Sequence, residues 1–134
     1  MKRIVLAGTL CLMLLCSCSG KPLPDGMDED ALLEAGQNVL LMIVDGDYTG
    51  VQALFRADVA AELTAEDIGE LAARQLDGAG EYRQITDRMT TGQSSNGESY
   101  GVAVFFCEYT KDKVLFRAAF DPNMTLIGIE LKRQ

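Results

Sequence analysis

The spacing of the apolar residues changes partway along this 134-residue chain. Between residues 28 and 76 they recur every three or four positions, which places them on one face of a helix. From residue 81 onward they recur at every second position, as in strands with one buried face. Helices followed by strands with short turns are typical of an α+β fold. We therefore expect N-terminal helices packed on a four-stranded antiparallel meander.

Capping and turn residues divide this pattern into elements. Helices are expected over 28–44, near 50–56, and from Thr64, a natural N-cap with Asp67 three residues later, to about residue 76. Three short turns are expected in the second half, at Asn96-Gly97, Lys111-Asp112 and Pro122-Asn123. They separate strands near 81–91, 99–109, 113–120 and 124–132.

The two faces of the predicted sheet differ in character. Two-residue turns would pair Cys107 with Phe116, and Phe116 with Ile129, on an apolar face that the helices cover. The opposite face mixes apolar and charged residues, which indicates an interface with a second copy or another protein. A half-covered sheet with scattered apolar residues is the alternative. The candidate interface comprises Val104, Phe106, Glu108, Leu115, Arg117, Leu126 and Glu130.

The first strand leaves two interpretations open. Counted back from Asn96-Gly97, its core-facing positions are polar and include Tyr82, Thr86 and Arg88. Either a bulge turns Ile85 and Met89 inward, or a polar-lined cavity lies between the helices and the sheet. In the second case the candidate pocket comprises Tyr82, Thr86, Arg88 and Tyr109.

The first seventeen residues have the order of an export signal: Lys2 and Arg3, an apolar run over 4–15, and then a small residue before a cysteine. The ending Leu15-Cys16-Ser17-Cys18 resembles the lipobox of bacterial lipoproteins. That resemblance implies cleavage after residue 17 and a diacylglyceryl group on Cys18, which would hold the protein on the outer side of the cell membrane. The alternatives are an ordinary cleaved signal or an uncleaved anchor. Residues 18–27 would then form the lipidated cysteine and a flexible tether, and 28–134 a single domain.

Composition narrows the chemistry of the mature chain. Residues 18–134 contain 10 basic and 20 acidic residues, a net charge of −10, so nucleic acid is not an expected partner. The chain has no histidine, which removes the commonest general base and metal ligand. Asp45 and Asp47 fit a turn after the first helix better than a metal site, and we expect no metal or cofactor. Cys107 is expected to be a small buried apolar group.

Three motifs resemble a family of uncharacterised bacterial lipoproteins. They are Gly46-Asp47-Tyr48 after the first helix, Gly80-x-Tyr82 before the first strand, and the segment FRAAFDPNMTLIGIEL over 116–131. That family is assigned a nuclear-transport-factor-two-like, cystatin-like cone. The resemblance implies a curved sheet wrapping the first helix, often with a concave pocket and often with dimers formed through the sheet.

Two functions of different classes remain at this stage. The first is a non-enzymatic accessory or binding module of the envelope, which acts through contact with another envelope protein, a second copy or the cell wall. The second is a small-molecule site, open to catalysis, between the helices and the sheet. Asp87, Tyr82 and Tyr109 are residue types that some enzymes of this fold use, but their spacing forms no motif, and we therefore name no catalytic residue.

Overall fold

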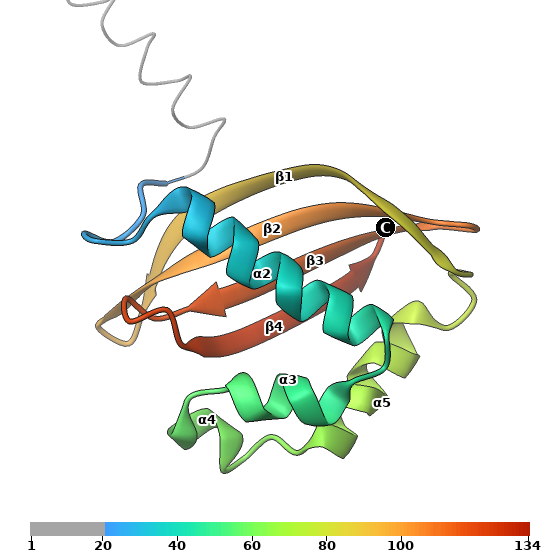
Figure 1. The fold of residues 1–134 in the computed structure, drawn as a ribbon, viewed down its shortest axis with the longest axis horizontal. Helices are drawn as coiled ribbons and strands as arrows, with labels where there is room; N and C mark the ends of the chain where they lie inside the picture. Colours follow the sequence, from blue (N-terminus) through green and yellow to red (C-terminus); the bar gives the residue numbers. More distant parts are fainter. Residues whose placement is uncertain (1–20) are drawn as a thin grey trace, which may run out of the picture.

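Helices precede a curved antiparallel sheet in the computed structural model, which describes residues 21–134. The described part contains α2 (Glu29–Val44), α3 (Tyr48–Leu54), α4 (Ala57–Ala60) and α5 (Ala65–Leu76), followed by β1 (Tyr82–Ser95), β2 (Glu98–Tyr109), β3 (Lys113–Phe120) and β4 (Leu126–Arg133). The strands lie in the order β1-β2-β3-β4, and all neighbours are antiparallel. The predicted α+β fold is confirmed (Figure 1).

The predicted export signal and Cys18 lie outside the described residues. Within residues 21–134, no helix has the length and apolar character needed to cross a membrane.

Helix α2 lies across the concave face of the sheet (Figure 1). It begins where the Asp28 carboxylate accepts a hydrogen bond from the Ala31 N–H, and it ends before Gly46, which takes a positive φ of 76°. Gly36 allows the close approach of helix to sheet, because a Cβ there would lie 2.7 Å from the Cβ of Ala103. The buried side of α2 packs on the centre of the sheet through Leu32, Val39, Leu40 and Ile43.

The core lies between α2 and the sheet and continues under the shorter helices. Phe105 and Phe116 are fully buried at its centre, on neighbouring strands, with ring centroids 6.2 Å apart. The capping box that the sequence predicts at Thr64 and Asp67 is present and starts α5, which packs against β4.

The last two turns differ from the predicted ones, and the pairing of the strands that they connect is shifted as a result. The β2–β3 chain reverses at Thr110-Lys111, so Cys107 faces Val114 rather than Phe116. A backbone hydrogen bond from Lys111 to Ala79 holds this turn. The register of β3 and β4 also moves by two residues, and Phe116 faces Leu131. A shift of two leaves each side chain on its predicted face, because the period of a strand is two.

Leu126 is the exception, and its predicted place in the interface is wrong. In the β3–β4 loop the Asp121 N–H donates to the Thr125 carbonyl, which closes a turn of three residues, Pro122 to Met124, with Met124 at a positive φ of 65°. A bulge lies next to it, between Ala119 and Phe120. The extra residue turns Leu126 inward, where it is 1% exposed and lies in the core beside Phe55.

Strand β1 contains register shifts at two places, between Tyr82 and Gln84 and between Ile85 and Asp87. The bulge interpretation is therefore correct for Ile85, which lies opposite Cys107 and packs on the core. It is wrong for Met89, which pairs with Val104 on the other face.

The segment from Lys21 to Met27 does not hang free as the predicted tether would. The Lys21 carbonyl accepts a hydrogen bond from the Gly92 N–H at 2.9 Å, and Lys21 N–H donates to Thr91 Oγ1 at 3.0 Å. Leu23 and Met27 pack against the core. The apolar side chains at these two positions explain the docking. The prolines and glycines of the segment had instead indicated a flexible tether.

Replacing Gly36 by Ala tests the close contact between α2 and the sheet. In an open helix this change stabilises by about 1 kcal/mol. Here the added methyl overlaps Ala103 and Phe105, so we expect a net loss of about 1–2 kcal/mol in the free energy of unfolding, measured by denaturant titration. The exposed Asn38→Ala in the same helix is the control and should be neutral or slightly stabilising. Equal stabilisation by both variants would contradict the contact.

Candidate functional site

The outer face, meaning the side of the sheet turned away from α2, is the first candidate site. None of the described helices covers it (Figure 1). Six of the seven predicted interface residues lie there, Leu126 being the exception: Val104, Phe106, Glu108, Leu115, Arg117 and Glu130. Phe106 is 36% exposed and is the one exposed aromatic side chain among the large apolar residues of 21–134.

Around Phe106 the outer face is apolar along β2 and charged toward its margins. Val102 and Val104 are 3% and 6% exposed, although no helix of the described chain lies over them. Arg117 faces Glu130 across β3 and β4, with Nε 3.6 Å from Oε1. Glu108 accepts a hydrogen bond from the Gln84 side chain at 2.8 Å. An apolar centre with a polar margin is the usual make-up of a protein–protein interface.

A shallow hollow of about 290 Å³ opens on this face, next to Val102. Its lining includes Tyr100, Val102, Arg117 and Glu130. The Tyr100 hydroxyl donates to Gln93 Oε1 at 3.2 Å. A partner side chain could enter this hollow beside the apolar centre, because both polar and apolar groups line it.

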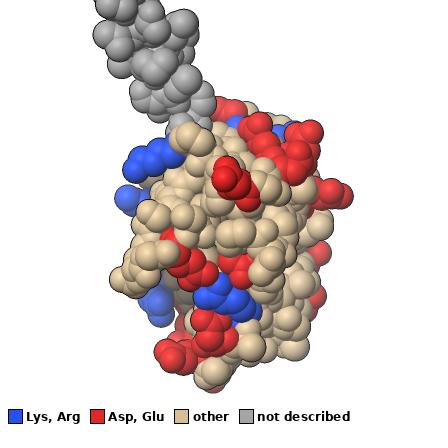
Figure 2. Space-filling view, turned by 90° about the vertical axis from the view of Figure 1, so that its left-hand side faces the viewer, with Lys and Arg blue, Asp and Glu red and all other residues tan. Residues whose placement is uncertain are grey.

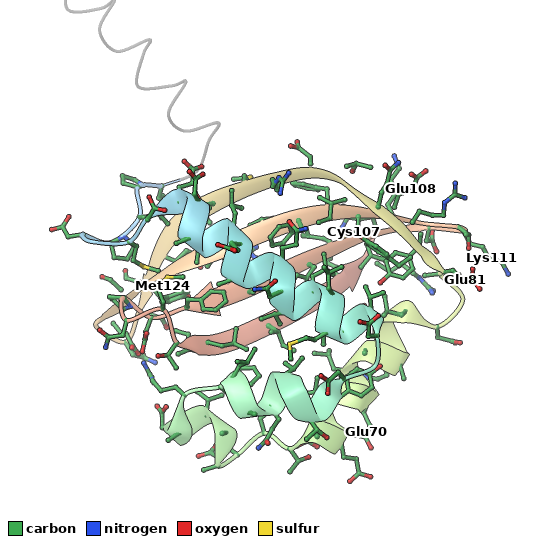
Figure 3. All side chains as sticks on the ribbon, in the orientation of Figure 1. Glu70, Glu81, Cys107, Glu108, Lys111 and Met124 are labelled. Atoms are coloured by element: carbon green, nitrogen blue, oxygen red, sulfur yellow. The ribbon has the colours of Figure 1, made fainter. Side chains whose placement is uncertain are left out.

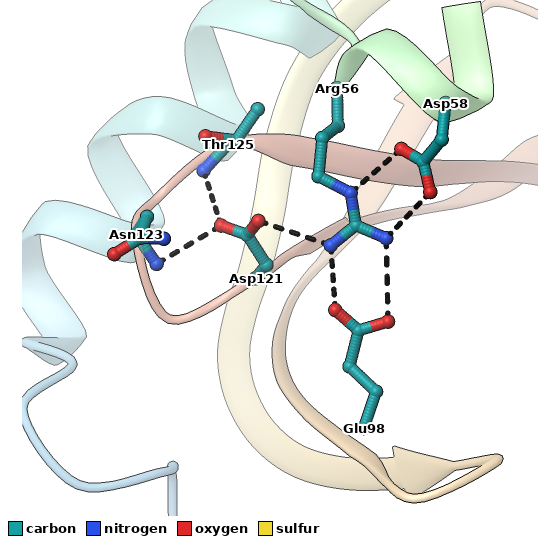
Figure 4. Close-up of polar contacts among 6 residues, drawn as sticks. All are labelled: Arg56, Asp58, Glu98, Asp121, Asn123 and Thr125. Carbon is teal, nitrogen blue, oxygen red and sulfur yellow. Dashed lines mark hydrogen bonds and ion pairs between the residues drawn. The ribbon is translucent and has the colours of Figure 1, made fainter.

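A second candidate site is the cluster around Arg56, which sequence reasoning missed (Figure 4). The guanidinium donates to Asp58 at 2.8 and 3.0 Å, to Glu98 at 2.6 and 3.4 Å, and to Asp121 at 3.2 Å. These carboxylates come from α4, the start of β2 and the β3–β4 loop, so only the tertiary fold brings them together. Figure 2 shows one end of the molecule, where Asp and Glu outnumber Lys and Arg.

The Arg56 cluster is internally satisfied rather than open to a ligand. The carboxylates, Asp58 foremost, raise the pKa of Arg56, and its guanidinium lowers the pKa of Asp58. Burial acts to raise the pKa of Asp121, but N–H groups of Thr125 and Asn123 together with Arg56 outweigh it, and the pKa is lowered. Every donor direction of the guanidinium is used, so we interpret the cluster as a clamp that joins α4, the start of β2 and the β3–β4 loop.

The predicted pocket is brought together in part. Tyr82 and Tyr109 meet edge to face, with ring centroids 5.7 Å apart, and they line a hollow of about 460 Å³ with Tyr48. Thr86 is instead exposed and donates to the Phe106 carbonyl at 3.0 Å. Arg88 donates to Gln37 on α2 at 3.1 Å. The two bulges of β1 separate these residues, because each bulge resets which side chains face inward.

The tyrosine pocket opens at the end of the sheet where Glu81 and Lys111 lie (Figure 3). Burial raises the pKa of Tyr109 to about 12, so this hydroxyl is protonated at neutral pH. Among the tyrosines of residues 21–134, Tyr100 alone makes a hydrogen bond through its hydroxyl. The Tyr109 hydroxyl, in a side chain 6% exposed, therefore has no protein partner there.

Other residues considered from the sequence do not form a site. Asp87 pairs with Phe106 on the outer face, on the opposite side of the sheet from Tyr82 and Tyr109. Asp47 caps α3 by accepting from the Gly50 N–H at 3.0 Å. The described residues hold no group of three or more potential metal ligands. Burial raises the pKa of the Cys107 thiol to about 11, as for an inert core residue.

Comparison with known proteins identifies the family. Residues 37–129 match the family described as "Protein of unknown function (DUF3887)". The chain belongs to this family. A protein from Ruminococcus gnavus ATCC 29149, solved by NMR, has a similar structure with a TM-score of 0.69 and 23% sequence identity. The likeness covers 81% of this chain and 95% of that one and shows the fold alone. No curated protein matches the chain.

Stability in acid should report on the Arg56 clamp. Asp58 and Asp121 have lowered pKa values in the folded protein, so the unfolded chain binds more protons in acid. Their contribution is present above the unfolded pKa of about 4 and is lost as the pH falls through the lowered folded values. Asp121→Asn keeps the Oδ1 acceptor for the loop but removes the charge. We expect a shallower fall in unfolding free energy from about pH 4 to pH 2.

Denaturant titrations at several pH values measure this effect. Glu62→Gln, at an exposed position outside the clamp, is the control and should retain the wild-type pH dependence. An unchanged slope in Asp121→Asn would mean that Asp121 contributes through its loop hydrogen bonds alone.

Proposed function

We propose that this protein is a lipid-anchored, extracytoplasmic binding module of the bacterial envelope, with a nuclear-transport-factor-two-like, cystatin-like domain. The charged start, apolar run and Leu15-Cys16-Ser17-Cys18 ending of the chain support the anchor. The order of helices and curved sheet supports the cone assignment. In this proposal the domain acts through contact with another envelope protein or a second copy.

The uncovered outer face is the observation that carries this proposal. Phe106 is exposed and faces Leu115 on β3. Val104, two residues away on the same face of β2, is buried. Aromatic residues at the centre of a patch commonly supply most of the binding energy. The margin is balanced in charge, because Arg117 pairs with Glu130. An acidic partner would therefore meet less repulsion here than on the helices.

The tyrosine pocket favours a second candidate function, the binding of a small polar aromatic or hydroxylated molecule. The specific observation is the Tyr109 hydroxyl, a buried group without a protein partner among residues 21–134, in a hollow that both apolar side chains such as Ile43 and the acidic Asp45 and Glu81 line. This function would leave the outer face without a role, so substitutions there distinguish the two candidates.

Replacing Phe106 by Glu should abolish the contacts of the outer face. Loss of a central aromatic anchor commonly costs 2 kcal/mol or more, so we expect at least about a tenfold fall in affinity. The measurement is chemical cross-linking in native membranes, with the cross-linked products quantified by mass spectrometry. Leu54→Glu is the matched control, since Leu54 is 44% exposed but lies on α3. The same products in wild type, Phe106→Glu and Leu54→Glu would overturn the interface.

The anchor is tested by the intact mass of the membrane-extracted protein. We expect a chain that starts at residue 18 and carries lipid, and we expect Cys18→Ala to lose the lipid because the sulfur is its point of attachment. A mass without lipid, or one that retains residues 1–17, would contradict the anchor.

A further inference from the structure

The docked segment Lys21–Met27, called the strap below, begins at the free edge of the sheet. It runs beside β1, where the Gly92 N–H donates to Lys21 and Thr91 Oγ1 accepts from Lys21. A Cβ on Gly92 would overlap the carbonyl oxygen of Pro22. Farther along, Met27 lies so close to Gly101 that a Cβ there would be 2.9 Å from its Cε. The strap is therefore fitted to glycines on β1 and β2.

The strap and the short helices lie at opposite edges of the sheet. β1 is the edge strand next to the strap, whereas α5 packs against β4 at the other edge. Figure 1 shows the described chain starting above β1 and α3, α4 and α5 lying below β4. Each strand, from β1 to β4, therefore lies farther from the start of the described chain than the one before it.

Charge is distributed along the same axis. Residues 45–77, which include α3, α4 and α5, contain eight acidic and two basic residues, a net charge of −6. Residues 78–95, which include β1, contain two of each and are neutral. The α3–α5 layer is therefore more acidic than β1, although Asp28, Glu29 and Asp30 place acidic groups beside the strap as well. An anionic membrane surface repels both groups, so the orientation depends on the short connection to the lipid and not on charge.

Only Cys18, Ser19 and Gly20 separate the proposed lipid from the strap. Three residues span at most about 10 Å. We propose that the strap holds the anchored domain on edge, with β1 next to the membrane and the α3–α5 layer away from it. This inference rests on the lipid anchor of the proposed function.

The orientation defines the kind of partner. With β1 at the membrane, the sheet stands upright, so its outer face is perpendicular to the membrane plane and is turned sideways. Phe106 then faces a neighbour that projects from the same membrane. The partner is the membrane-proximal surface of an integral membrane protein, because a distant wall polymer would meet the acidic α3–α5 layer first.

Gly92→Ala should release the strap without a penalty elsewhere. The φ of Gly92 is an ordinary one, so the new methyl conflicts only with the strap at Pro22 and Leu23. Release would extend the connection from three residues to ten, with a reach of about 35 Å. Gly128→Ala in β4 is the matched control, because its Cβ would lie at an ordinary 3.7 Å from Ala119.

Energy transfer from labelled protein to acceptor lipids measures the orientation. The full-length lipidated protein is placed in vesicles of phosphatidylcholine and phosphatidylglycerol. A donor is attached through Ser94→Cys, next to the strap, or through Glu70→Cys on α5, at the far side (Figure 3). Labelling is selective, since Cys107 is buried and burial raises its pKa to about 11.

We expect stronger transfer from position 94 than from position 70 in the wild type and in Gly128→Ala. Gly92→Ala should remove this difference. A Gly-Ser insertion between Gly20 and Lys21 that adds about 20 Å of reach should also remove it while leaving the strap docked, so the inference can be tested even where Gly92→Ala destabilises the domain. Equal transfer from both positions in the wild type, or a difference that survives both changes, would overturn the orientation.

The outcomes separate this inference from the proposed function. Loss of lipid in the mass measurement would remove the anchor and the orientation together. An oriented domain whose cross-links survive Phe106→Glu would retain the strap and refute the outer-face interface. Cross-links to a second copy rather than to an integral membrane protein would refute the partner assignment and leave the orientation intact.

Discussion

The contact between α2 and the concave face of the sheet is the constraint on which the remaining structure depends. Gly36 brings the helix backbone against Ala103 and Phe105, and the fully buried Phe105 and Phe116 fill the space around it. Because one helix covers one face of the sheet, the other face is left to solvent. The open outer face is thus a direct consequence of how the core is closed.

Arg56 holds three segments of the chain together at one end of the domain. Its bonds to Asp58, Glu98 and Asp121 connect α4, the β1–β2 hairpin and the β3–β4 loop. Asp121 also accepts from two backbone N–H groups in its own loop. The turn that Asp121 and Thr125 close has three residues rather than two, and this difference buries Leu126. Local loop chemistry therefore decides which residues belong to the core and which to the candidate interface.

The sheet was predictable in its strands and faces but not in its detail. Alternation identified β2 and β3 and assigned Val104, Phe106 and Arg117 to the uncovered face, since a period of two survives a shift of two residues. Bulges follow no such period, so the places of Ile85, Thr86 and Leu126 could not be read from alternation. The Arg56 clamp was also invisible, because its partners lie 2, 42 and 65 residues away along the chain.

Local periodicity and composition were enough to set the α+β order of elements, the helix cap at Thr64 and the acidic character of the chain. Packing of the folded chain was needed to dock Lys21–Met27 on the edge of β1, and to give Tyr82 and Tyr109 a shared pocket without Thr86 and Arg88. These features depend on contacts between distant segments, and the free energy of such contacts is set by the packed fold rather than by neighbouring residues.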